Sequence, residues 1–315
     1  MNRFVLSATF GLVFTLLAAS SGHAQATIKV LKDKETGIAV MIGDELFTKL
    51  DIDNFRRPIL YPVYGPGQVP MTRNHPMKPG VEGEAEDHPH HKSIWCGHGL
   101  INGVSFWHEE GQIKVDYSKP VSFSMHNGTA IISFSSNYVD ADYRLVCTDD
   151  TKLSFSLLPD GSRAIDWEFT IHASERDLLF GDTKEGMMAV RTHPSLRIDK
   201  GAKAVNSEGV EGKDIWGKHA EWVDYTANVE GSDVGLAIFD HPSNLRHPTT
   251  WHARAYGLVA ANPFGLHHFE GKPRGAGDLR LAKGDSLSFR YRVVLHKGDV
   301  GPDHVAKLFE DYKNN

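Results

Sequence analysis

Residues 129–172 of the 315-residue chain read TAIISFSSNYVDADYRLVCTDDTKLSFSLLPDGSRAIDWEFTIH. Apolar and polar residues largely alternate over 129–136, 153–158 and 165–172, which is the period of a strand that is buried on one face. The turn-forming pair Asp160-Gly161 separates two of these segments. Short alternating segments with turns between them predict antiparallel β structure.

The same alternation returns near the C-terminus, where residues 287–296 read LSFRYRVVLH. Only residues 302–312 resemble an amphipathic helix, which begins with a proline and places apolar residues on one face. The sequence contains no internal repeat and no linker-like change of composition. We therefore expect one all-β domain over residues 25–315, a large antiparallel β-sandwich with a short C-terminal helix.

The first residues are typical of a secretory signal peptide. Arg3 precedes an apolar run over residues 4–19, and small residues follow up to Ala24. The run is short for a membrane span, and no later segment approaches the roughly 20 apolar residues that such a span needs. We expect cleavage after Ala24 and a periplasmic or secreted protein. Cys96 and Cys147 could form one disulfide in that compartment, and the sequence leaves their pairing open.

Charge and motifs exclude several classes of protein. The formal net charge of −6 gives no basic surface for nucleic acid. The sequence has no glycine-rich phosphate loop, no GxSxG nucleophile elbow, no HExxH zinc motif and no CxxC pair. What stands out is the number of histidines, 18 in all, many of which lie in three polar segments.

The first polar segment reads DHPHHK over residues 87–92 and follows a loop, residues 65–86, that we expect to lie over a site. The proline in the segment favours an extended backbone. His88 and His90 are then expected to point to one side of the chain and His91 to the other.

Two histidines on one side supply two nitrogens for a divalent metal such as zinc, which needs at least one more protein ligand. The candidates for that ligand are His75, His98 and Glu185. The alternative, which we favour, is that His88 and His90 donate hydrogen bonds to backbone or substrate oxygens, because two nitrogens alone do not define a metal site.

The second polar segment reads GDTKEG over residues 181–186 and leads to Arg191 and His193. Glu185 and His193 form a candidate carboxylate–imidazole couple for general acid/base catalysis, since burial can move both pKa values towards neutral pH. The alternative is a solvated charged turn held by a salt bridge.

The third polar segment covers residues 240–248 and continues through Trp251, His252, Arg254 and Tyr256. Histidine, arginine and aromatic residues together suit polyol recognition, because hydroxyl groups need directional partners and sugar C–H faces stack on rings. The alternative for each aromatic residue is burial for packing alone.

Several of these motifs resemble the PmoA-like family, and the resemblance covers nearly the whole mature chain. The matching motifs are His88-Pro-His-His-Lys, Trp95, His98-Gly99, Asn102-Gly103, Phe106-Trp107, Gly181-Asp182, Glu185-Gly186, Arg191, Trp222-Val-Asp224-Tyr225, Asp240-His-Pro, Arg246-His247-Pro248 and Asn262-Pro-Phe-Gly. The resemblance implies a large β-sandwich of the galactose-mutarotase type and a role with carbohydrates. It does not imply methane oxidation, because the chain lacks the membrane spans of that enzyme.

We expect a carbohydrate-active enzyme that uses acid/base chemistry on a sugar or oligosaccharide, by epimerisation, hydrolysis or β-elimination. The alternatives are a metal-dependent hydrolase or oxidase that uses His88 and His90, and a carbohydrate-binding protein without turnover. No organic cofactor is expected. The expected proton-transfer or electrophilic residues are His91, Glu185, His193 and His247, and the expected substrate-binding residues are Arg73, Trp107, Arg191, Arg254 and Tyr256. Five of these, His91, Glu185, Arg191, His247 and Arg254, should face a single cavity.

Overall fold

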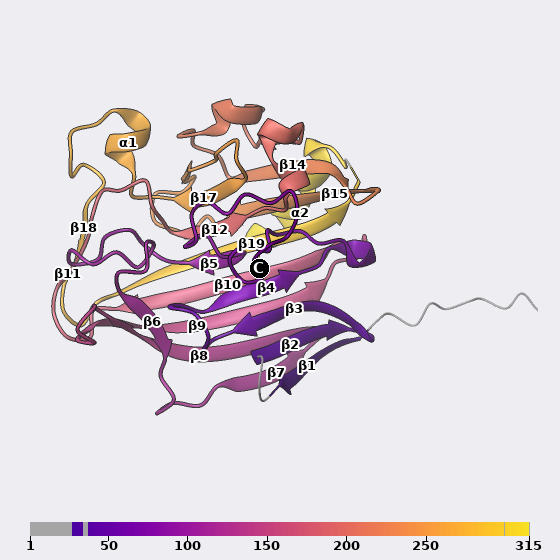
Figure 1. Cartoon of the computed structure of the whole chain (residues 1–315). Coiled ribbons are helices and arrows are strands. Elements are labelled where there is room, and N and C mark those ends of the chain that lie inside the picture. Colours follow the sequence, from indigo (N-terminus) through magenta and orange to yellow (C-terminus); the bar gives the residue numbers. More distant parts are fainter. Residues whose placement is uncertain (1–26, 34–36, 299, 315) are drawn as a thin grey trace, which may run out of the picture.

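The alternating segments are neighbouring strands of one antiparallel sheet (Figure 1). The computed structural model describes residues 27–33, 37–298 and 300–314, so the predicted signal peptide lies outside the described residues. The predicted segments fall in β8 (Thr129–Val139), β9 (Leu145–Leu157), β10 (Arg163–His172) and β19 (Ser286–Lys297). The prediction of antiparallel β structure is confirmed.

Two large sheets and one small sheet make up the described strands. The eight-stranded sheet has the order β1 (Ile28–Asp33), β2 (Gly37–Ile42), β3 (Glu45–Asp51), β4 (Ile59–Val63), β5 (Ile94–Cys96), β12 (Met188–Arg191), β17 (Leu258–Asn262), β16 (Thr250–Trp251). The nine-stranded sheet has the order β13 (Lys203–Asn206), β14 (Trp222–Val229), β15 (Ser232–Asp240), β19, β10, β9, β8, β6 (Gln112–Val115), and β7 (Ser122–His126) also pairs with β8. The small sheet pairs β11 (Leu178–Phe180) with β18 (Leu279–Leu281).

The inner faces of the two large sheets share one hydrophobic core, as a β-sandwich requires. Phe47 on β3 and Phe155 on β9 meet edge to face across it, with 6.0 Å between ring centroids. Cys96 and Cys147 also lie in this core, and both are free thiols. Burial alternates along β8 and β10, because every second residue of a strand points inwards.

Three short strands of the eight-stranded sheet are buried on both faces. Every residue of β5, β12 and β17 is buried, which is the pattern of strands covered from two sides. Their outer face carries a second apolar cluster, which contains Ile59, Trp95, Trp107, Ala189, Leu258 and Ala260. Segments between the strands therefore pack over this part of the sheet, and the candidate site lies there.

The C-terminal helix is present as predicted and is α2 (Pro302–Lys313). Its Val305, Leu308 and Phe309 pack against Trp222 and Phe239 on the outer face of the nine-stranded sheet. The other helical elements are α1 (Leu266–Glu270) and the 3-10 turns η1 (Pro66–Gln68), η2 (Pro194–Leu196), η3 (Ile198–Lys200) and η4 (Gly212–Ile215). Neither α-helix of the described chain has the length and apolar character needed to cross a bilayer.

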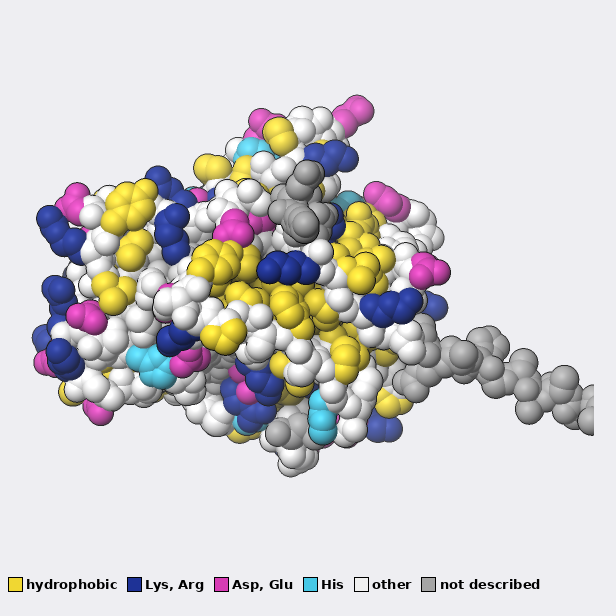
Figure 2. Space-filling view, turned by 90° about the horizontal axis from the view of Figure 1, so that it is seen from below, with side chains coloured by type: hydrophobic (Ala, Val, Ile, Leu, Met, Phe, Trp, Pro, Cys, Tyr) yellow, Lys and Arg dark blue, Asp and Glu magenta, His cyan; other side chains and the backbone are white. Residues whose placement is uncertain are grey.

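The underside of the molecule, where β1 and β7 lie in Figure 1, shows a gathering of apolar side chains (Figure 2). The exposed large apolar residues include Leu31 on β1 and Phe123 and Met125 on β7.

Candidate functional site

Four side chains form a row across the outer face of the eight-stranded sheet. Trp95 on β5 lies opposite Ala189 on β12, and Ala189 lies opposite Ala260 on β17. His252 exchanges two backbone hydrogen bonds with Ala260, of 2.8 and 3.2 Å. Directly opposed residues point to the same side of a sheet, so the four share a face. The two small alanines separate the indole from the imidazole.

Two arginines lie next to this row, each two residues further along the chain than one of its members. Arg191 comes two residues after Ala189, and Arg254 comes two residues after His252, so both side chains return to the outer face. Their guanidinium carbons lie 4.7 and 5.7 Å from the ring centroid of Tyr256. Both arginines therefore contact the same tyrosine ring.

Two buried arginines hold the loops that cover this face. Arg57 donates hydrogen bonds to the carbonyl oxygens of His90, Phe106 and Trp107. Arg73 donates to the carbonyl oxygens of His75, Ala85, Asp87, His88 and His91. We expected Arg73 to bind substrate, but it is only 2% exposed and its guanidinium shapes the histidine segment instead.

The histidine segment is a tight turn, and the expected extended backbone is wrong. His88 has a φ of 45°, and the N–H of His91 donates to the carbonyl of His88 at 2.9 Å, with Pro89 inside the turn. The imidazoles of His88 and His91 consequently stack, with 4.8 Å between ring centroids and 6° between planes. His90 instead contacts His108, at 4.8 Å between ring centroids.

The stack connects the turn to the sheet on one side and to Tyr256 on the other. His91 lies 5.5 Å from Trp95 at 20°, and His88 lies 5.2 Å from Tyr256 at 8°, both measured between ring centroids. The buried indole of Trp107 meets His91 edge on, at 5.6 Å. Trp107, which we expected to hold substrate, supports the stack from behind.

The turn keeps the imidazoles of His90 and His91 neutral. Burial lowers the pKa of His91 far below its ordinary range, and burial together with His108 and Arg57 lowers the pKa of His90 to about 3. Nη1 of Arg191 lies 3.2 Å from Nδ1 of His91. Because a guanidinium only donates, Nδ1 accepts this bond and Nε2 of the neutral ring carries the proton.

Asp87 joins the stack to two arginines. Its Oδ1 accepts hydrogen bonds from Arg73 at 2.5 Å and from Arg191 at 2.7 Å, and its Oδ2 lies 2.9 Å from Nδ1 of His88. Burial raises the pKa of Asp87, but Arg191, His88 and Arg73 outweigh it and hold the pKa below its ordinary value. Both oxygens of this carboxylate are therefore occupied.

Glu185 and His252 form a second carboxylate–imidazole contact on this face. Nδ1 of His252 lies 3.7 Å from Oε2 of Glu185, which is too long for a hydrogen bond. Both atoms are buried and have no hydrogen-bond partner among the described residues. The other carboxylate oxygen of Glu185 is paired with Lys184. The two side chains thus approach each other without bonding.

The imidazole of His252 is neutral. The charge of Glu185 and a backbone contact with Lys184 raise its pKa, but they are outweighed by burial. Burial is the larger effect and lowers the pKa of His252 to about 4. At neutral pH the ring is therefore uncharged, and its unpartnered Nδ1 lies near a carboxylate oxygen that also has no hydrogen-bond partner among the described residues.

His193 does not join Glu185, so the expected couple is not formed. Glu185 precedes β12 and His193 follows it, at the opposite end of the strand. Nδ1 of His193 accepts a hydrogen bond from the N–H of Ser195 at 3.2 Å and caps the short η2 turn. The imidazole that Glu185 does meet belongs to His252.

His247 also has partners outside this group. Its Nδ1 lies 2.8 Å from Oδ2 of Asp240, a carboxylate that also accepts hydrogen bonds from Asn244 and Thr249. Burial raises the pKa of Asp240. Nε2 of His247 lies 3.9 Å from Glu221. These contacts make a separate network around the end of β15.

The structure thus brings His91, Glu185, Arg191, Arg254 and Tyr256 onto one face and adds His252. Electrostatics agree with this grouping: burial raises the pKa of Tyr256, and the charges of Arg254, Arg191, Glu185 and Asp87 also act on it. We gave His252 no role from sequence. The available signal was its two-residue spacing from Arg254, which places both side chains on the same side of an extended segment.

The described residues contain no group of three or more His, Cys, Asp or Glu side chains arranged to hold a metal ion. Of the proposed third ligands, Nε2 of His98 lies 3.0 Å from the carbonyl of Gly181, and one carboxylate oxygen of Glu185 is paired with Lys184. Both ring nitrogens of His75 are buried and have no hydrogen-bond partner among the described residues. Among the described residues, none of the three joins His88 and His90 in a group that could hold a metal ion.

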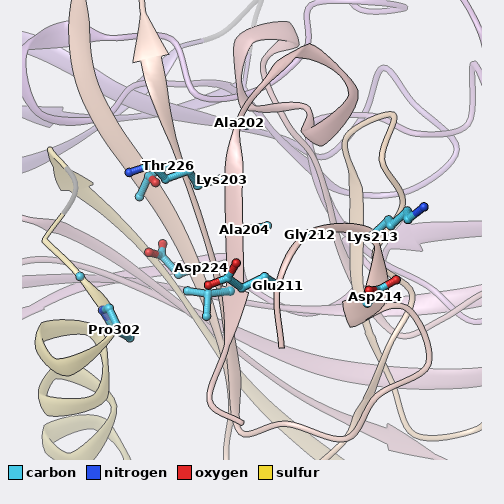
Figure 3. Close-up of a pocket in the computed structure, with 12 residues that line it drawn as sticks. Ala202, Lys203, Ala204, Glu211, Gly212, Lys213, Asp214, Asp224, Thr226 and Pro302 are labelled. Atoms are coloured by element: carbon cyan, nitrogen blue, oxygen red, sulfur yellow. The ribbon is translucent and has the colours of Figure 1, made fainter. Parts of the chain in front are cut away.

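A cavity of about 520 Å³ lies elsewhere, between β13, β14, η4 and the start of α2 (Figure 3). Carboxylates of Glu211, Asp214 and Asp224 line it. Asp224 is already paired with the buried His296, with 3.0 Å between Oδ1 and Nε2. None of the residues predicted for the site lines this cavity, so we place the candidate site on the eight-stranded sheet.

A family model described as a family of unknown function, DUF6807, matches residues 37–310. No curated protein matches the chain. The resemblance to the PmoA-like family stays a prediction.

Among solved structures, the chain is similar to the Slr1438 protein from Synechocystis sp. PCC 6803, with 10% identity, a TM-score of 0.36, and coverage of 92% of this chain and 100% of that one. It is also similar to a GalM/aldose epimerase homologue from C. elegans, with 10% identity, a TM-score of 0.32, and coverage of 87% and 99%. A polysaccharide lyase matches with 14% identity, a TM-score of 0.33, and coverage of 91% and 34%.

Proposed function

Since the chain belongs to the DUF6807 family, whose function is unknown, we propose a function from the site itself. The protein is a carbohydrate-active enzyme in which Glu185 and His252 move protons on a sugar or an oligosaccharide. The signal-like residues 1–24 support a periplasmic or secreted location for this enzyme.

The observation that carries the proposal is the unbonded contact between Glu185 and His252. Two buried polar atoms that approach to 3.7 Å without a hydrogen bond are unfavourable unless a ligand brings a hydrogen-bond donor to them. A sugar hydroxyl supplies such a donor, and its oxygen then accepts from a neighbouring group. The contact is therefore suited to a ligand with hydroxyl groups.

The surroundings favour a sugar over an apolar ligand. Arg254 and His88 are exposed beside the half-buried ring of Tyr256, and they offer directional hydrogen bonds next to an aromatic group. Saccharides are recognised by this combination, because hydroxyl groups need directional partners while C–H faces contact rings.

Acid/base roles follow from the protonation of the imidazoles. His252 is neutral at pH 7 and accepts a proton at Nδ1, and Glu185 orients the hydroxyl or C–H group that gives it up. His91 keeps its proton on Nε2 while Arg191 holds its Nδ1, so it is fixed as a donor. Epimerisation, hydrolysis and β-elimination all need such a pair of proton acceptor and donor.

The test is conversion of oligosaccharides by the purified mature chain. Mass spectrometry and NMR of polysaccharide digests separate the three reactions: hydrolysis adds water, β-elimination gives an unsaturated sugar, and epimerisation changes NMR couplings without changing the mass. We expect Glu185→Gln and His252→Gln each to lower turnover by about 10²- to 10⁴-fold, the usual contribution of a positioned acid or base.

The matched control is His172→Gln, which removes an imidazole from another carboxylate pair. His172 lies 2.9 Å from Asp150 on the outer face of the nine-stranded sheet and is partly exposed. This variant should keep full turnover. Full activity of Glu185→Gln would contradict the proposal, and a saccharide that binds without conversion would make the protein a binding protein.

A further inference from the structure

The exposed edge of the site is positively charged, although the whole chain is acidic. Arg254 is exposed, and its guanidinium lies over the ring of Tyr256 at 5.7 Å. Burial raises the pKa of Tyr256, so its hydroxyl stays protonated and can donate. The side chains of Arg254 and Tyr256, which are in contact, therefore supply one cationic and one neutral donor beside the site.

The nearby carboxylates are already engaged by other groups. Asp87 bonds to Arg73 and Arg191, and Glu185 is paired with Lys184. Glu84 accepts hydrogen bonds from the backbone N–H groups of Asn74 and His75. Asp87 and Glu185 thus already have cationic partners, and Glu84 is held by backbone N–H groups.

Among the cations beside the site, Arg254 is the one that is not paired with these carboxylates. Within the described part of the chain it has no carboxylate partner, and its side-chain contact is the Tyr256 ring. The neighbouring imidazoles of His91 and His252 are neutral and add no charge. One positive charge thus remains for a ligand.

We propose that the substrate is an acidic saccharide, whose carboxylate or sulfate ester binds Arg254 and the hydroxyl of Tyr256. This inference rests on the proposed function and names its substrate class. A guanidinium presents a planar fork of N–H donors that matches a carboxylate, and such charge-assisted bonds are stronger than neutral ones. The sugar ring then extends from this anchor towards Glu185 and His252.

The chain has a formal net charge of −6, so the binding of an anionic ligand depends on the local charge of Arg254. An anion is repelled by most of the surface. Binding should therefore weaken as salt increases, because salt screens an exposed charge. A neutral sugar at the same site should show little dependence on salt.

The experiment measures equilibrium binding by calorimetry with Glu185→Gln, in which the site is kept while turnover is slowed. The probes are oligomers of galacturonate, glucuronate and mannuronate, their methyl esters as neutral partners, and sulfated galactose disaccharides. We expect one acidic probe to bind at least about tenfold tighter than its neutral partner, in line with a charged hydrogen bond. Comparison of the uronate oligomers with the sulfated disaccharides identifies which anionic group, carboxylate or sulfate ester, is bound.

Variants of Arg254 then test the anchor. Adding Arg254→Gln should remove the preference for the acidic probe, and Arg254→Lys should keep part of it because the charge remains. The control is Arg280→Gln, another exposed arginine that lies on β18 in the small sheet, and it should leave binding unchanged.

The possible results separate this inference from the proposed function. If neutral saccharides bind as tightly and wild-type protein converts them, the acidic substrate is wrong while the enzyme proposal stands. If acidic probes bind but Arg254→Gln has no effect, the anchor is wrong. If no saccharide binds or is converted, both proposals fail.

Discussion

Asp224 and His296 on the nine-stranded sheet form a closed pair, whereas Glu185 and His252 beside the eight-stranded sheet form an open one. In the closed pair Nε2 and Oδ1 are 3.0 Å apart, and both side chains are at most 3% exposed. In the open pair the closest atoms are 3.7 Å apart and unbonded. The residue types are alike, so the difference lies in how each pair is held.

The pKa values of the two imidazoles are shifted in opposite directions. Burial lowers the pKa of both rings, but in His296 the hydrogen bond and charge of Asp224 outweigh burial and raise the pKa. In His252 burial dominates and the pKa falls to about 4. The closed pair therefore favours the protonated, hydrogen-bonded form of its imidazole, while the open pair keeps a neutral imidazole next to a carboxylate.

A glycine makes the closed pair possible. His296 lies opposite Gly235 on β15, and Gly235 lies opposite Thr226 on β14. A Cβ built on Gly235 would lie 2.0 Å from Cε1 of His296. The missing side chain thus lets the imidazole cross a whole strand to reach Asp224.

The largest expected effect on stability comes from removing the carboxylate of the closed pair. Asp224→Ala leaves a buried imidazole without its partner, and we expect it to lower the free energy of unfolding by about 3–5 kcal/mol. Urea unfolding followed by circular dichroism measures this. The control is Asp142→Ala, which breaks an exposed pair with Arg144 and should change stability by less than about 1 kcal/mol.

The pH dependence of this loss has a definite sign. Because the folded-state pKa of His296 is raised, its contribution to stability is fully present below the unfolded pKa of about 6.5 and is lost as pH rises through the folded pKa. The difference between wild type and Asp224→Ala should therefore be larger near pH 6 than near pH 9. An equal difference at both pH values would contradict the ion pair.

A smaller loss is expected from Gly235→Ala. The new methyl group displaces the ring of His296, and an overpacked core site typically destabilises by about 1–3 kcal/mol. In the Asp224→Ala background the further loss should shrink, because the pair is already broken. If the two losses simply add, Gly235 does not serve the pair.

Most of the fold could be predicted from the sequence because its signals are local. Alternation over residues 165–172 and 287–296 identified strands that pair directly, with Glu168 opposite Arg290. Pro302 and the apolar face that follows it identified α2. The period of a strand or helix depends only on neighbouring residues, so these predictions needed no knowledge of distant contacts.

The site could be predicted only in part, because its geometry depends on residues distant in sequence. Sequence indicated Glu185, Arg191 and Arg254 as a group. It missed His252 as the partner of Glu185, since their contact spans 67 residues and has no local signal. The turn at His88 was also missed, because the hydrogen bonds that shape it come from arginines far along the chain.

The smallest expected effect is on the stability of the open pair. His252→Gln replaces an imidazole that makes no hydrogen bond with Glu185, and the new amide can donate to Oε2 of Glu185. We expect the free energy of unfolding at pH 7 to change by less than about 1 kcal/mol, in either direction, because no bond is lost. As pH falls from about 6.5 towards 4, wild type should lose stability relative to the variant, since unfolded His252 takes up a proton that the folded ring refuses. Urea unfolding at pH 7 and near pH 5 measures both effects. A loss of several kcal/mol at pH 7 would mean that this pair is closed like Asp224 and His296, and that it holds the fold together rather than awaiting a substrate.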